Sequence, residues 1–259
     1  MLVNDVFSFL DGLAPFSYAM DFDNSGLLVG DPLQPVEKIL VALDCTSSVV
    51  QAAKESGAQL IVTHHPVIFD PIKSVIAGSI PYQLASAGIS VICAHTNLDL
   101  ARGGVNDELA RRLGLGCLEG LSPIPCTDRD KNTVTEYLGR ISFLPNPMEP
   151  QDFARFVKEQ LGAGIRFTLG RRPVHRVAVC GGAGADCLDD AIQAGADALV
   201  TAEVKHHVFL SAAQRGITLV DAGHFHTEDV VIEPLAQRLR EQFPETEVLA
   251  WHLTEIQVI

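Results

Sequence analysis

The two halves of the chain repeat one pattern of apolar runs and glycines, and this repeat limits the folds open to it. GAQLIVTHHPV aligns with GADALVTAEVKHHV at a constant offset of 138 residues, which pairs Gly57 with Gly195. SAGISVICAHT resembles AQRGITLVDAGHFHT at an offset of 128 residues, which pairs Gly88 with Gly216. One duplicated unit explains both matches.

Each copy is expected to form strand, helix, strand, helix, strand. The runs IVT, LVT, ISVICA and ITLVDA are almost continuously apolar, as strands buried on both faces are. The segments between them have helical spacing of apolar residues and end in glycine. The chain is therefore predicted to be an α/β protein with two pseudo-repeated α/β lobes and mostly parallel sheets.

The expected division of the chain is a first lobe over residues 1–125 and a second over residues 126–259. The boundary is placed near LSPIPCTDRDKN, and the segments that follow it add a strand (EYLGRISF), a helix (MEPQDFARFVKEQLG) and a short strand (IRFTL). The C-terminal helix and strand could pack back on the first lobe.

Composition excludes several classes of protein. The net charge is −13, and the 19 basic residues are scattered, so a nucleic-acid partner is not expected. No apolar run approaches the roughly 18 residues that span a bilayer, and the N-terminus does not resemble a signal peptide. Six cysteines without CxxC spacing favour a cytoplasmic protein over a secreted one.

Histidines and carboxylates follow several predicted strands, where the chain leaves the sheet. His64 and His65 come directly after IVT, and an extended pair should point its rings to opposite sides, so that two metal ions could take one ring each. Asp99 follows ISVICA, and His224 and Glu228 follow ITLVDA. Thr227 is predicted to cap a helix running toward Arg240. These five residues are predicted to bind two divalent ions, for which Zn, Fe, Mn and Co all suit the ligands.

Three further histidines are candidates for catalysis. His95 could orient a ligand or transfer protons, while His206 and His207 could either line the site or simply begin a helix. The glycine-rich loops at residues 102–107 and 180–186 precede helices and could cradle an anion, although plain strand-to-helix turns explain them more simply.

Five motifs together resemble the GTP cyclohydrolase I type 2 homolog family, also called Nif-three-like. They are DNSGLLVG (23–30), THHPVIF (63–69), AHTNLDLARGGVND (94–107), VKHH (204–207) and DAGHFHTE (221–228). The resemblance is to the short form, without an inserted domain. It implies a dinuclear metal site at the same five residues, two α/β lobes facing a cleft and a toroidal homohexamer. The chain departs from the family pattern at Ala202 and Glu203.

Three functions agree with these residues. The first is a metal-dependent hydrolase that acts on a nucleotide-like or phosphorylated small molecule. The second is a non-catalytic metal carrier or chaperone, and the third is an interaction scaffold in which metals only stabilise the lobes. The family name by itself does not establish a reaction.

Overall fold

The computed structural model describes residues 1–257 and has a mixed α/β fold with two sheets. The first sheet has the order β1-β4-β3-β2-β11 and the second has the order β5-β6-β8-β9-β10-β7. The strands of the first sheet are β1 (Gly26–Val29), β2 (Lys38–Ala42), β3 (Leu60–Thr63), β4 (Ser90–Cys93) and β11 (Glu247–Trp251). The strands of the second are β5 (Gly116–Thr127), β6 (Thr133–Met148), β7 (Arg166–Thr168), β8 (Val174–Val179), β9 (Ala198–Thr201) and β10 (Thr218–Asp221).

The repeat seen in the sequence is present in both sheets. In the first, β2, β3 and β4 are parallel neighbours, and in the second β8, β9 and β10 are parallel neighbours. Parallel β11 extends the first sheet and antiparallel β1 closes its other end, whereas antiparallel β6 and β7 flank the parallel strands of the second. The second sheet is therefore less parallel than the sequence suggests, because its flanking strands come from segments outside the repeat.

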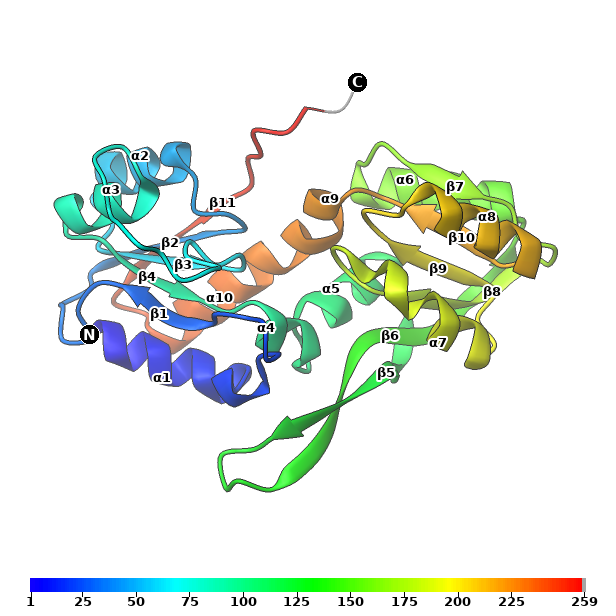
Figure 1. The fold of residues 1–259 in the computed structure, drawn as a ribbon, viewed down its shortest axis with the longest axis horizontal. Helices are drawn as coiled ribbons and strands as arrows, with labels where there is room; N and C mark the ends of the chain where they lie inside the picture. Colours follow the sequence, from blue (N-terminus) through cyan, green and yellow to red (C-terminus); the bar gives the residue numbers. More distant parts are fainter. Residues whose placement is uncertain (258–259) are drawn as a thin grey trace. The chain divides into compact units, whose positions relative to one another are not determined.

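Helices cover both faces of the first sheet (Figure 1). One face carries α2 (Ser47–Ser56) and α3 (Ile80–Ala87), and the other carries α1 (Val3–Leu13) and α10 (Ile232–Gln242). The short helix α4 (Thr96–Leu100) follows β4, and a 3-10 turn, η1 (Phe16–Tyr18), follows α1. Gly57 and Gly88 end α2 and α3 in the left-handed conformation, with φ of 72° and 65°.

The second sheet is also covered on both faces. Val177 and Val179 of β8 pack in one core with Phe153, while Ala178 packs in the other core with Leu188. This alternation is that of a strand buried on both faces. The first core includes α5 (Val105–Arg112) and α6 (Pro150–Leu161), and the second includes η2 (Gly184–Cys187), α7 (Leu188–Gln193) and α8 (His206–Arg215). After β10 come α9 (His224–Glu228) and η3 (Asp229–Val231).

The chain divides into two compact units that interleave along the sequence. The first comprises Met1–Ala101, Cys126–Thr133 and Ile232–Leu253, and the second comprises Arg102–Pro125, Val134–Val231 and residues 254–257. This differs from the expected division at residue 125. The segment expected to separate the lobes forms β5 and the turn into β6, and α5 shares a core with β8. The C-terminal α10 and β11 group with the first unit.

All six cysteines are free thiols, and Cys93, Cys126, Cys180 and Cys187 are buried. Among residues 1–257, no helix combines the length and apolar character that crossing a membrane requires.

The core of the second unit gives a test of its packing. Phe153 is fully buried, whereas Phe143 of the same unit is 48% exposed. Phe153→Ala should lower the free energy of unfolding by roughly 3–5 kcal/mol through lost burial and the cavity left behind. Phe143→Ala should cost about 1 kcal/mol or less, because it mainly removes the packing of the Arg176 guanidinium over the Phe143 ring. Urea unfolding followed by circular dichroism measures both, and equal costs would contradict the packing described.

Candidate functional site

Three histidines form a cluster in the first unit that could hold a metal ion. His64 and His65 follow β3 directly, and His95 precedes α4. One nitrogen from each ring lies within 4.8 Å of the others, and the His64 and His65 ring centroids are 5.0 Å apart. The expectation that these two rings point to opposite sides is wrong, because β3 ends at Thr63 and the alternation of a strand stops there.

An oxygen atom holds the Nδ1 atom of each ring in this cluster. His64 Nδ1 lies 3.0 Å from the Ala94 carbonyl oxygen, His65 Nδ1 lies 2.7 Å from Asp44 Oδ1, and His95 Nδ1 lies 2.8 Å from Asp23 Oδ1. A carbonyl or ionised carboxylate can only accept, so Nδ1 carries the proton and the lone pair of a neutral ring is on Nε2. Histidines that bind metals are commonly oriented in this way.

Asp99 and Asp23 add negative charge to the same region of the first unit. Asp99 lies on α4, and its Oδ1 is 3.7 Å from His64 Nε2. Burial alone would raise the pKa of the Asp23 carboxyl, but hydrogen bonds from His95, Thr96 and Ser25 outweigh burial and hold that pKa well below its usual range. Asp23 is therefore ionised at neutral pH and fixes the His95 ring.

In the second unit, His224 and Glu228 lie four residues apart on α9. His224 Nε2 is 2.9 Å from Glu228 Oε2, and His224 Nδ1 is 2.7 Å from Glu203 Oε1. The predicted helix start at Thr227 is wrong. The helical segment begins at His224, and the Thr227 hydroxyl donates back to the carbonyl oxygens of Gly223 and His224.

The glycine-rich loop at residues 180–186 packs directly against this pair. A Cβ atom on Gly182 would lie 2.1 Å from Glu228 Oε1 and 3.1 Å from His224 Nε2, and the φ of Gly182 is +60°. The Gly182 N–H also donates to Thr227 Oγ1 over 3.0 Å. Only glycine fits at this position, because the loop approaches the candidate ligands too closely to leave room for a Cβ atom.

His206 and His207 begin α8 in the second unit, and both are exposed. Within residues 1–257, neither belongs to a group of three or more side chains that could hold a metal ion. Their predicted catalytic role stays a prediction, whereas His95 lies within the histidine cluster of the first unit.

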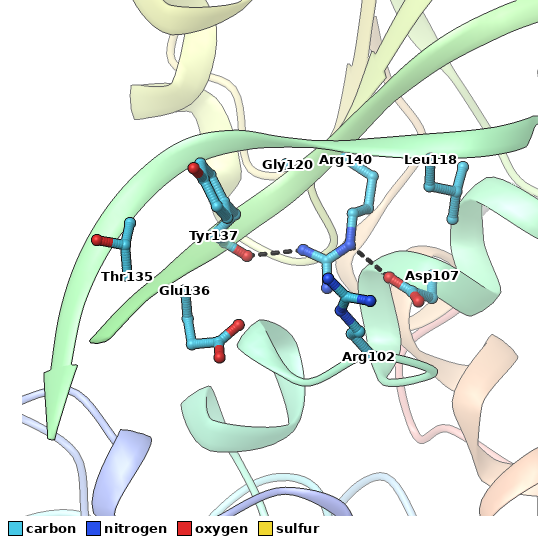
Figure 2. Close-up of a pocket in the computed structure, with 8 residues that line it drawn as sticks. All are labelled: Arg102, Asp107, Leu118, Gly120, Thr135, Glu136, Tyr137 and Arg140. Carbon is cyan, nitrogen blue, oxygen red and sulfur yellow. Dashed lines mark hydrogen bonds and ion pairs between the residues drawn. The ribbon is translucent and has the colours of Figure 1, made fainter. Parts of the chain in front are cut away.

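The loop at residues 102–107 lines a pocket of about 320 Å³ in the second unit (Figure 2). Asp107 accepts a hydrogen bond from the Gly103 N–H and pairs with the buried Arg140, whose guanidinium also donates to the Tyr137 carbonyl oxygen. The Asp107 carboxylate thus occupies the N-terminus of α5, where an anion would otherwise bind. Arg102 and Arg140 are matched in number by Asp107 and Glu136, so the pocket offers no net positive charge to an anion.

Sequence reasoning missed the three carboxylates that orient the rings, namely Asp23, Asp44 and Glu203. Asp44 ends the run KILVALD, and Asp23 opens the motif DNSG. A carboxylate placed at the end of a strand was a usable signal for Asp44. Glu203 stands two residues after β9, where its φ is +52°.

The comparisons with known proteins agree with this fold. A family profile, Duf34/NIF3 (NGG1p interacting factor 3), matches residues 1–257. The chain belongs to the Duf34/NIF3 family. A Clostridium perfringens relative with the name GTP cyclohydrolase 1 type 2 homolog is 32% identical, over 93% of this chain and 92% of that protein. A Streptomyces coelicolor relative of the same name is 35% identical, over 87% of this chain and 81% of that protein.

Solved structures of the family share the whole fold. A hypothetical protein from Staphylococcus aureus is 31% identical and superposes with a TM-score of 0.92, covering 100% of this chain and 99% of that one. A Bacillus cereus protein related to NIF3 is 25% identical, with a TM-score of 0.91 and the same coverage. The two-sheet α/β fold predicted from the sequence is confirmed.

The orienting carboxylates should control metal affinity. Asp44→Ala removes the acceptor of His65 Nδ1 and should weaken Zn²⁺ binding by roughly 10- to 100-fold, the usual effect of losing such a partner. Asp152→Ala, which removes an exposed carboxylate on α6, is the matched control and should change nothing. Competition with a chromophoric chelator measures both affinities, and an unchanged affinity in Asp44→Ala would contradict the orienting role.

Gly182 can be tested against a glycine that has the same backbone conformation but open space beside it. Gly57 has a φ of +72°, and a Cβ atom added there would meet nothing within 4 Å. Gly182→Ala and Gly57→Ala should each lose about 1–2 kcal/mol of stability from left-handed strain. Only Gly182→Ala should also weaken metal binding, since its methyl group would displace Glu228. Equal metal affinities in the two variants would refute this account of the loop.

Proposed function

We propose that the protein binds two divalent metal ions through His64, His65, Asp99, His224 and Glu228 and hydrolyses a nucleotide-like or phosphorylated small molecule. The observation that carries the proposal is the common orientation of the rings. In both units, an oxygen acceptor holds Nδ1 of each candidate histidine, which directs the ligating lone pair to Nε2.

The number of donors supports two ions rather than one. The first unit supplies His64, His65 and Asp99, and the second supplies His224 and Glu228. A structural zinc site uses four ligands, so five side chains exceed the need of one four-coordinate ion. Asp99 and Glu228 are both buried, and carboxylates in such surroundings are costly unless a cation or hydrogen bonds compensate them.

The proposed reaction is hydrolysis. Divalent ions held by these residues would act as Lewis acids and make water a nucleophile near neutral pH. The remaining imidazole, His95, is proposed to transfer a proton, because Asp23 accepts the hydrogen bond from its Nδ1 and so orients the ring with its Nε2 lone pair available. The name of the relatives, GTP cyclohydrolase 1 type 2 homolog, supports a nucleotide-like substrate. Assembly as a homohexamer is proposed on the family resemblance and is checked by light scattering.

Metal content and turnover, measured on the same preparations, test this function. Wild-type protein loaded with Zn, Fe, Mn or Co should hold two ions per chain and hydrolyse at least one member of a panel of nucleotides and phosphate esters. Glu228→Gln should lose metal and turnover together, since it removes a charged ligand. His95→Gln should keep both ions and lose turnover, and Glu241→Gln on exposed α10 surface should match wild type.

Two results would contradict the proposal. One ion per chain would exclude the dinuclear site. Two ions without turnover of any panel member, together with ready transfer of metal to a chelator while the protein stays folded, would favour the non-catalytic carrier instead.

A further inference from the structure

Two exposed phenylalanines stand beside the histidine cluster of the first unit. Phe22 is 63% exposed and Phe69 is 46% exposed. Their ring centroids are 6.4 Å apart with the ring planes tilted by 42°, so that a planar ligand can stack on one ring while its edge contacts the other, and the Phe69 ring meets the His95 ring edge-on at 6.3 Å. Large aromatic side chains are usually buried. An exposed pair next to candidate metal ligands therefore indicates a surface that a ligand covers.

Hydrogen bonds fix the backbone that carries both rings. Asn24 Nδ2 donates to the Ile68 carbonyl oxygen over 2.6 Å, which ties the loop of Phe22 to the loop of Phe69. Asp23, the next residue after Phe22, holds the His95 ring and the Thr96 amide. The two phenylalanines are therefore positioned by the same network that orients His95.

We infer that Phe22 and Phe69 form a stacking face for a planar aromatic heterocycle of the substrate. Aromatic side chains stack on the π-face of any base, and an exposed face gains from covering its apolar surface. This inference rests on the proposed function and narrows its substrate class. It favours a nucleobase-like ring over a sugar phosphate, which has no flat aromatic surface.

Charged residues around the stacking face restrict the class of ligand further. Asp21 and Asp70 adjoin the two phenylalanines in the chain, are exposed, and are not among the candidate metal ligands. Carboxylates repel an anionic ring and accept hydrogen bonds from amino groups. The ring bound here is therefore neutral or cationic and carries N–H donors, as amino-substituted purines, pyrimidines and pterins do.

Calorimetric titration of the full chain with guanosine, adenosine, cytidine and pterin tests the inference, with ribose 5-phosphate as the ligand that lacks an aromatic ring. At least one ring compound should bind wild type. The double variant Phe22→Leu/Phe69→Leu should weaken its binding by roughly 5- to 150-fold, the usual effect of removing aromatic stacking. Phe69→Tyr keeps a ring and should retain the affinity, and Ile76→Ala, an equally exposed aliphatic position, should match wild type.

The titrations are run with and without Zn²⁺, and circular dichroism and metal content are measured for each variant. Loss of ring binding with two ions still bound supports the stacking face. No ring compound bound by wild type, or equal affinity in the double variant, overturns it. If the double variant changes its oligomeric state but still binds the ring compounds, the two phenylalanines contact a second copy of the chain. That result also overturns the stacking face. If the protein binds no metal, ring binding can still be measured in the metal-free protein. The proposed metal site and the proposed stacking face can therefore be contradicted independently.

Discussion

The hydrogen bond from an imidazole Nδ1 to a protein oxygen is the interaction on which the candidate site depends. It recurs at His64, His65, His95 and His224, with acceptors on a backbone carbonyl and three carboxylates. Each bond fixes both the tautomer and the rotation of its ring, so the ligating nitrogen is directed before a metal arrives. Orientation settled in advance removes an entropic cost of binding and explains why acidic side chains accompany the histidines.

Duplication explains where these groups stand, and divergence between the copies explains their different roles. The shared offset places His64 and His65 opposite Ala202 and Glu203. In the first copy the position after the strand carries an imidazole oriented by Asp44, whereas in the second the equivalent position carries Glu203, which orients His224. One backbone position thus supplies a candidate ligand in one copy and its support in the other.

The repeat made the alternation of strands and helices in each half predictable from the sequence, together with the strand ends at which polar groups gather. The oxygen partners were not predictable, because His65 and Asp44 are 21 residues apart and His95 and Asp23 are 72 apart. Such pairs depend on which strands become neighbours, and local patterns do not record this. The division into units failed to follow a single boundary for the same reason, since β11 pairs with β2 across most of the chain.

The balance of charge bears on the order in which ligands could bind. Under the proposed function, the ligands and the groups that orient them include five carboxylates, Asp23, Asp44, Asp99, Glu203 and Glu228, and the three ligand imidazoles are neutral when Nε2 binds a metal. Such a set repels phosphate until cations compensate it. Under the proposed function, metal therefore precedes any phosphorylated ligand, whereas an uncharged ring can settle on Phe22 and Phe69 at either stage. Two different interactions would then bind the two halves of a nucleotide-like molecule. Apolar contact would bind the ring, and the metal ions would bind the phosphate.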